Sequence, residues 1–149
     1  MLKNIPAILS PELLKILMEM GHGDEIVIAD GNFPAAYIAK HTVSGQLIRM
    51  DGHGVPPVLE AILSVCPLDQ YVDKALGLME VCPGDDVATP IWDEYKKIVK
   101  ASGEPFEDFE YIERFAFYER AKQAYAVIAT SEAALYANVI LKKGCIIQK

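Results

Sequence analysis

Short apolar segments alternate with segments of helical periodicity along this chain, and this alternation constrains the fold more than any other feature. Residues 25–29 and 125–130 are apolar runs of strand length. Residues 11–18 instead repeat leucine and methionine at helical spacing. Helices alternating with buried strands are typical of layered α/β domains. The sequence therefore predicts a single α/β domain over residues 1–149 with a largely buried sheet.

Helix and turn signals predict the remaining elements. Ser10 is expected to cap the first helix, because Pro11 suits the first helical position. An edge strand is expected within residues 106–113, and a turn of helix at 131–134. The other expected elements are strands at 47–49, 75–81 and 138–141 and helices at 55–65, 90–100 and 117–124.

Composition disfavours several classes of function. Hydrophobic residues make up 52% of the 149 residues, enough for a substantial core. The net charge of −7 disfavours nucleic acid or a polyanion as partner, whereas a neutral substrate fits. No apolar run approaches the roughly 20 residues of a membrane span, and no signal peptide is recognisable. The three cysteines form no CxxC pair and are expected as reduced thiols, so we predict a cytoplasmic protein without a membrane partner.

His22 is the first candidate for chemistry. It stands between Gly21 and Gly23, after a predicted helix and before a predicted strand. Flanking glycines leave space around the ring, and an imidazole exchanges a proton near neutral pH. The alternative is a loop histidine that bonds only locally, and position alone leaves both interpretations open.

Asp30 is the second candidate, because it follows a strand at the end where α/β proteins commonly place ligand groups. It comes eight residues after His22, so both side chains are expected at the same rim of the sheet. A carboxylate accepts hydrogen bonds from sugar hydroxyls. Capping of the turn at Gly31 and Asn32 is the alternative role.

Two further pairs suit a ligand with many hydroxyl groups. Arg114 and Tyr118 are four residues apart and share a face in a helix, where they offer directed donors and an aromatic ring. Tyr136 and Asn138 offer neutral hydrogen-bonding groups at the entry to the last predicted strand. An ordinary amphipathic helix and a turn-forming asparagine are the alternatives.

Motifs for other kinds of site do not occur in the sequence. The histidines lack ligand spacing such as HExxH, and there is neither a P-loop nor a GxGxxG after a strand. No serine or cysteine sits in a nucleophile motif such as GxSxG. We therefore expect no metal and no cofactor.

Taken together and in order, the motifs resemble the RbsD/FucU family, and more narrowly its L-fucose branch. The similarity runs from about Leu2 to Gly144, nearly the whole chain. The segments that carry it are Ser10-Pro11-Glu12-Leu13-Leu14, Gly21-His22-Gly23-Asp24-Glu25-Ile26, Asp30 with Asn32-Phe33-Pro34, Arg114-Phe115-Ala116-Phe117-Tyr118-Glu119-Arg120-Ala121, and Tyr136-Ala137-Asn138 with Leu141-Lys142-Lys143-Gly144.

The resemblance implies a layered α/β/α domain with a mixed, mostly parallel sheet. It also implies a cofactor-free mutarotase that interconverts the α and β anomers of a monosaccharide. His22 would be its catalytic acid/base group. The residues that would bind the sugar are Asp30, Arg114, Tyr118, Tyr136, Ala137 (through its backbone only) and Asn138.

The family also implies a homo-oligomer, a ring-shaped homodecamer. In it, Arg114, Tyr118 and Tyr136 would complete a site begun by His22 of a neighbouring chain. Two other functions stay open: a ribose-type pyranase of the same family, which Arg114 and Tyr118 disfavour, and a non-catalytic sugar-binding or regulatory module. His53 and the tail 145–149 match none of the family motifs.

Overall fold

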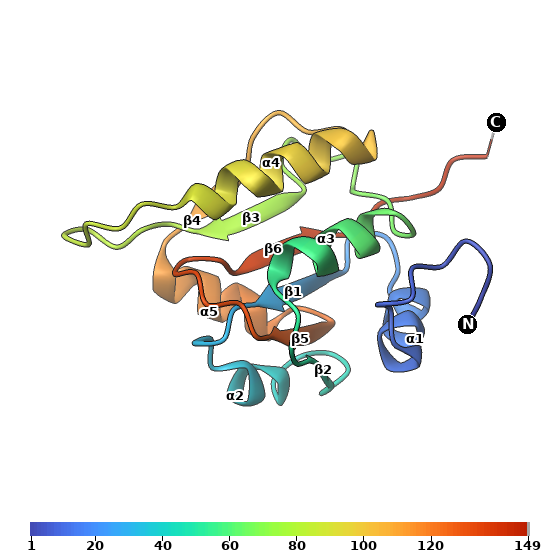
Figure 1. The fold of residues 1–149 in the computed structure, drawn as a ribbon, viewed down its shortest axis with the longest axis horizontal. Coiled ribbons are helices and arrows are strands. Elements are labelled where there is room, and N and C mark those ends of the chain that lie inside the picture. Colours follow the sequence, from blue (N-terminus) through green and yellow to red (C-terminus); the bar gives the residue numbers. More distant parts are fainter. Residues whose placement is uncertain (149) are drawn as a thin grey trace.

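The computed structural model describes residues 1–148, and Lys149, the last residue of the predicted domain, lies outside them. Within this range six strands form one sheet in the order β2-β5-β1-β6-β3-β4 (Figure 1). The strands are β1 (Glu25–Ala29), β2 (Leu47–Met50), β3 (Leu76–Met79), β4 (Glu110–Ile112), β5 (Ala126–Thr130) and β6 (Val139–Lys142). Only β6 runs against its neighbours, β1 and β3, and the other pairs are parallel. The expected mixed, mostly parallel sheet is confirmed.

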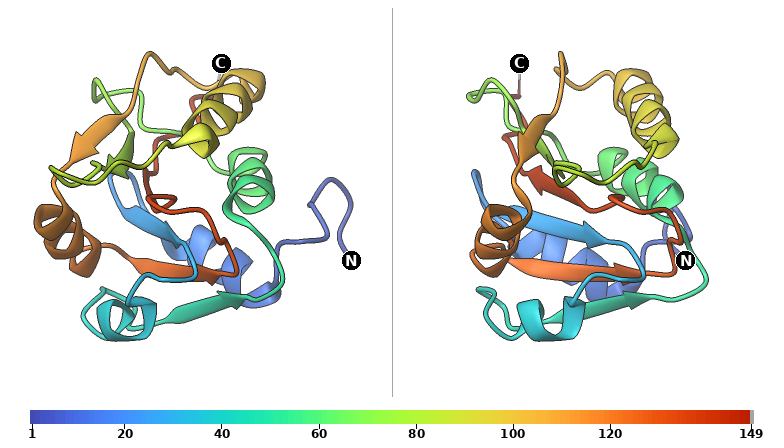
Figure 2. Two further views of the ribbon diagram at one scale, coloured as in Figure 1. Left: turned by 60° about the vertical axis from the view of Figure 1, so that its left-hand side comes forward. Right: turned by 90° about the vertical axis from the view of Figure 1, so that its left-hand side faces the viewer.

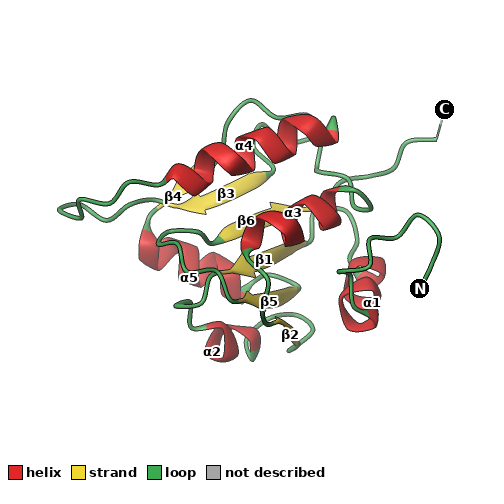
Figure 3. Cartoon of the chain, viewed as in Figure 1, coloured by secondary structure: helices red, strands yellow, loops and turns green. Residues whose placement is uncertain are grey.

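Helices cover both faces of this sheet and produce three layers (Figures 2 and 3). The helices are α1 (Pro11–Glu19), α2 (Ala35–Ala39), α3 (Val55–Leu63), α4 (Pro90–Ser102) and α5 (Arg114–Lys122). Successive side chains of a strand point to opposite faces. Ile26 and Ile28 of β1 therefore pack with α1, α3 and α4, whereas Val27 and Ala29 pack with α2 and α5.

Helix caps explain where two of the helices begin. The Ser10 hydroxyl accepts a hydrogen bond from the Leu13 N–H at 3.2 Å, which confirms the predicted start of α1. The carboxylate of Glu113 accepts from the N–H groups of Phe115 and Ala116, both at 3.0 Å. Because of this cap, α5 begins at Arg114, three residues before the predicted start at 117.

The expected turn of helix at 131–134 is wrong. The Glu132 carboxylate instead accepts from the N–H groups of Val55 at 3.1 Å and Ala134 at 3.0 Å, and its backbone carbonyl accepts from Gly31 at 2.8 Å. These bonds tie the connection between β5 and β6 to neighbouring loops. They consume the backbone and side-chain groups that would have supported a local helix.

Two observations bear on the expectations drawn from composition. Cys66, Cys82 and Cys145 are free thiols, and burial raises the pKa of Cys66 to about 11. In the part of the chain that the structure describes, the helices are too short or too polar to cross a membrane.

Candidate functional site

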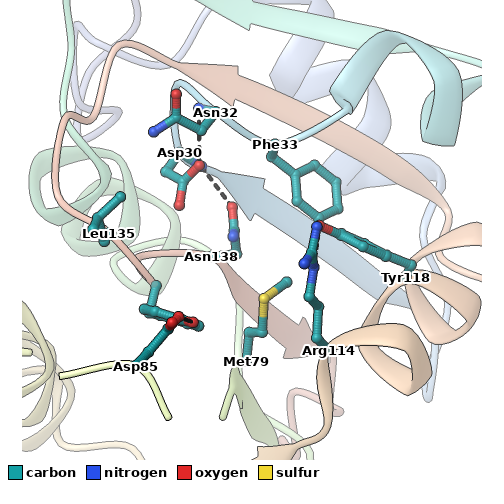
Figure 4. Close-up of a pocket in the computed structure, with 10 residues that line it drawn as sticks. Asp30, Asn32, Phe33, Met79, Asp85, Arg114, Tyr118, Leu135 and Asn138 are labelled. Atoms are coloured by element: carbon teal, nitrogen blue, oxygen red, sulfur yellow. Dashed lines mark hydrogen bonds between the residues drawn. The ribbon is translucent and has the colours of Figure 1, made fainter. Parts of the chain in front are cut away.

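A pocket opens at the edge of the sheet where β1 and β3 end and β6 begins (Figure 4). Its volume is about 250 Å³. Sites for drug-sized ligands usually enclose roughly 300–1,000 Å³, so this pocket suits one small molecule. Its lining residues are Asp30, Asn32, Phe33, Met79, Asp85, Arg114, Tyr118, Leu135, Tyr136 and Asn138.

Asp30 and Asn138 form a buried polar floor, with 5% and 4% of their surface exposed. The Asp30 N–H donates to Asn138 Oδ1 at 2.8 Å, a bond drawn in Figure 4. The Asp30 carboxylate accepts from the N–H groups of Asn32 at 3.0 Å and Ala137 at 3.3 Å. Burial raises the pKa of Asp30, and these N–H groups oppose that rise. The floor thus offers a carboxylate acceptor beside the NH₂ donor of Asn138.

Arg114 and Tyr118 form one wall, from the first turns of α5. As predicted, they share a face of a helix, and Arg114 Nε donates to Tyr118 Oη at 3.2 Å. The Tyr118 ring packs against Phe33, with ring centroids 5.6 Å apart. A directed cation thus lies beside an aromatic wall, a combination that suits a ligand with hydroxyl groups on an apolar ring.

Tyr136 and Asp85 lie together on another side of the pocket. The Tyr136 hydroxyl donates to the Asp85 carboxylate and accepts from the Cys82 N–H at 3.2 Å. Tyr136 has a φ of 55°, in the left-handed region. Its carbonyl accepts from Trp92 Nε1 at 2.8 Å. Sequence reasoning identified Tyr136 but missed Asp85, because an acidic residue in a Pro-Gly-Asp-Asp turn carries no signal for a ligand.

Ala137 contributes to this site from behind the lining. It is fully buried, and its N–H donates to Asp30. Its carbonyl accepts from the Tyr95 hydroxyl at 2.7 Å. Both backbone groups are therefore engaged within the protein, and Ala137 supports the site through the orientation of Asp30.

His22 lies at the opposite edge of the sheet. It precedes β1, whereas Asp30 follows it. A strand of five residues spans about 17 Å at roughly 3.3 Å per residue. The expectation that His22 and Asp30 share a rim is therefore wrong within one chain, because an intervening strand carries them to opposite edges.

His22 is held there by an acidic partner. Its Nε2 lies 2.9 Å from Asp69 Oδ1, and its ring centroid lies 5.3 Å from that of Tyr71. The His22 side chain is 45% exposed, whereas that of Asp69 is 4% exposed. Burial would raise the pKa of Asp69, but hydrogen bonds from the Tyr71 N–H and from His22 outweigh it and lower this pKa. An ionised carboxylate therefore orients an accessible imidazole.

Asp69 could not be found from the sequence, because it lies 47 residues from His22 in an unpredicted loop. His53, the glycine-flanked histidine without a matching motif, is exposed and lies outside the pocket lining. Among residues 1–148, no three His, Cys, Asp or Glu side chains gather closely enough to hold a metal ion.

Comparison with known proteins identifies close relatives over nearly the full length. A model of the RbsD / FucU transport protein family matches residues 3–146. A protein named fucose mutarotase from Homo sapiens is 52% identical over 146 residues, which cover 96% of this chain and 93% of the relative.

Two solved structures are similar throughout. FucU from Bifidobacterium longum is 58% identical, with a TM-score of 0.92 over 97% of this chain and 100% of that one. A fucose mutarotase from Streptococcus pneumoniae, solved in complex with L-fucose, is 49% identical, with a TM-score of 0.89 over 98% of this chain and 100% of that one.

Proposed function

The chain belongs to the RbsD/FucU family, and we propose that it is an isomerase that interconverts the α and β anomers of L-fucose. Relatives named fucose mutarotase, about half identical over nearly the whole chain, support this function. The observation that carries it is the pocket at the β1 and β6 edge. Its buried acceptor, neutral donors, arginine and apolar surfaces match the mixed surface of a monosaccharide.

Mutarotation requires two proton transfers. The ring oxygen gains a proton as the ring opens, and the anomeric hydroxyl loses one; the reverse transfers close the ring on the other face. In this proposal His22 is the acid/base group, and the Asp69 carboxylate fixes the orientation of its ring. Asp30, Arg114 and the other polar lining residues, Tyr118, Tyr136 and Asn138, hold the hydroxyl groups, and no cofactor takes part.

The proposed site needs two chains. Because His22 and the pocket lie at opposite edges, His22 of one chain serves the pocket of a neighbour. Large apolar side chains are exposed beside both parts of the proposed site. Tyr71 lies next to His22, and Phe115 and Leu135 lie beside the pocket. Repeated contacts between unlike surfaces form a ring where the rotation between neighbouring chains closes. The proposed assembly is the homodecameric ring of the family, built from single domains of residues 1–149 and located in the cytoplasm.

Exchange spectroscopy tests the activity directly. Saturation-transfer NMR of L-fucose measures the rate at which the α and β anomers interconvert. The proposal expects this rate to rise in proportion to protein concentration. Saturable sugar binding without faster exchange would instead establish a non-catalytic sugar-binding or regulatory module.

The apolar part of the pocket predicts the sugar preference. Phe33, Met79 and Leu135 offer a surface for the C6 methyl group of L-fucose, which D-ribose lacks. L-galactose carries a hydroxyl on that carbon, and we expect its kcat/KM to fall on the order of 10²-fold, as for a hydroxyl entering an apolar site. The same NMR assay across the three sugars measures the preference. Faster exchange of D-ribose would establish the ribose-type alternative.

Asp69→Asn tests the partner of the proposed acid/base group. The amide keeps the size of the side chain but removes the carboxylate charge that orients the imidazole. We expect kcat to fall on the order of 10²-fold, the usual cost of misplacing a reacting group by about 1 Å. Asp73→Asn, an exposed change in the same loop, is the matched control. Equal rates in the two variants would remove Asp69 from the mechanism.

A further inference from the structure

Asp85 is a pocket residue to which the resemblance assigns no role. It belongs to the connection between β3 and α4, and Figure 4 shows it across the cavity from Arg114. Asp85 is exposed, so the protein core does not require it. Its carboxylate nevertheless accepts a hydrogen bond from the Tyr136 hydroxyl.

Hydrogen bonds hold both the backbone and the hydroxyl group of Tyr136. Its backbone is left-handed, with a φ of 55°, and its carbonyl accepts from Trp92 Nε1. Its hydroxyl bonds to Asp85 and to the Cys82 N–H. Tyr136 needs such support, because the left-handed backbone conformation is unfavourable for residues other than glycine and asparagine. The ring is therefore presented to the pocket in one orientation.

These contacts also set the direction of the hydrogen bonds that Tyr136 can make. A phenolic hydroxyl carries one proton and two acceptor lone pairs. The proton points to Asp85, and one lone pair accepts from Cys82. One acceptor position remains for a ligand. The bond to Asp85 also raises the pKa of Tyr136 to about 12, so the phenol gives up its proton less readily than an ordinary tyrosine.

We infer that Asp85 is a positioning residue of the sugar site, which holds Tyr136 as an acceptor for one sugar hydroxyl. The inference rests on the proposed function. Because its proton is donated to Asp85, Tyr136 recognises the sugar and does not deliver a proton to the ring oxygen. Proton transfer is left to the group supplied by the other edge of the sheet.

Kinetics of five variants test this inference. Asp85→Ala should raise the KM for L-fucose about tenfold, near the upper limit for one neutral hydrogen bond, and change kcat little, because the contact is equal in ground and transition states. Asp85→Asn should have a KM close to that of the wild type, since the amide carbonyl oxygen accepts the same hydrogen bond from Tyr136. Asp86→Asn, an exposed carboxylate in the same turn, should match the wild type. The double variant Asp85→Ala/Tyr136→Phe should have the same KM as Tyr136→Phe alone, because both changes remove the same interaction.

A spectroscopic readout separates positioning from general damage. Tyrosine labelled with ¹³C at Cζ reports the phenol titration, and Tyr136→Phe identifies the resonance. Asp85→Ala should lower the pKa of Tyr136 from about 12 toward the ordinary value of about 10. An unchanged pKa, or additive effects in the double variant, would overturn the inference. If the wild-type protein did not accelerate anomer exchange, the proposed function would be overturned instead. The titration would still decide whether Asp85 controls the hydroxyl of Tyr136.

Discussion

His22→Ala is expected to reduce the acceleration of L-fucose anomer exchange by on the order of 10²–10⁴-fold, the usual contribution of a well-placed acid/base group. The side chain is accessible, and the buried Asp69 carboxylate orients it. Alanine leaves no acid/base group at that position. Sugar binding should persist, because the pocket at the other edge is unchanged.

Two measurements are needed for this variant. Saturation-transfer NMR gives the exchange rate, and calorimetric titration with L-fucose gives the affinity. His53→Ala is the matched control, since His53 is also exposed and flanked by glycines but lies outside the pocket lining. If His22→Ala exchanged anomers as fast as His53→Ala, the acid/base group would have to be sought elsewhere.

Activity should reappear when two inactive chains are combined. Asp30→Ala removes the acceptor floor of the pocket but keeps His22, whereas His22→Ala keeps the pocket. In an oligomer assembled from equal amounts of both, about a quarter of the interfaces pair an intact His22 with an intact pocket, because each interface joins unlike surfaces. Co-expressed chains should therefore regain about a quarter of the wild-type rate.

The control for this experiment pairs His22→Ala with the double variant His22→Ala/Asp30→Ala. That mixture contains intact pockets but no His22, so it should remain inactive. Native mass spectrometry establishes that mixed oligomers have formed. Mixed oligomers of the first pair that show no activity would contradict a site shared between chains.

Sequence patterns predicted most of the strands because each lies in a short apolar run bounded by turn residues. The strand at 25–29 matches β1 at both ends. The failures occur where distant contacts decide the conformation. The segment 131–134 contains helix-forming residues, but Glu132 bonds to Gly31 and Val55 instead. The short helix α2 was not predicted, because Ala35–Ala39 is too short to display a helical period.

In the candidate site, too, local pairs of residues could be predicted from the sequence and distant pairs could not. Arg114 and Tyr118 could be paired in advance because both lie on one helix. The pairing of Asp69 with His22, and that of Asp85 with Tyr136, joins loops 47 and 51 residues apart. Only the folded chain brings such loops together. The separation of His22 from Asp30 was missed because spacing along the chain does not show which edge of a sheet a residue reaches.

The reversed direction of β6 has a consequence for how such proteins diversify. Because β6 runs against β1 and β3, the segment that precedes it lies at the edge where those strands end. Tyr136 and Asn138 therefore meet Asp30 across a connection of eight residues, 131–138, while His22 and Asp69 lie at the far edge. Insertions and substitutions in that connection can remodel the choice of sugar without disturbing the proposed acid/base pair. The fold thus permits substrate preference to evolve separately from the chemistry.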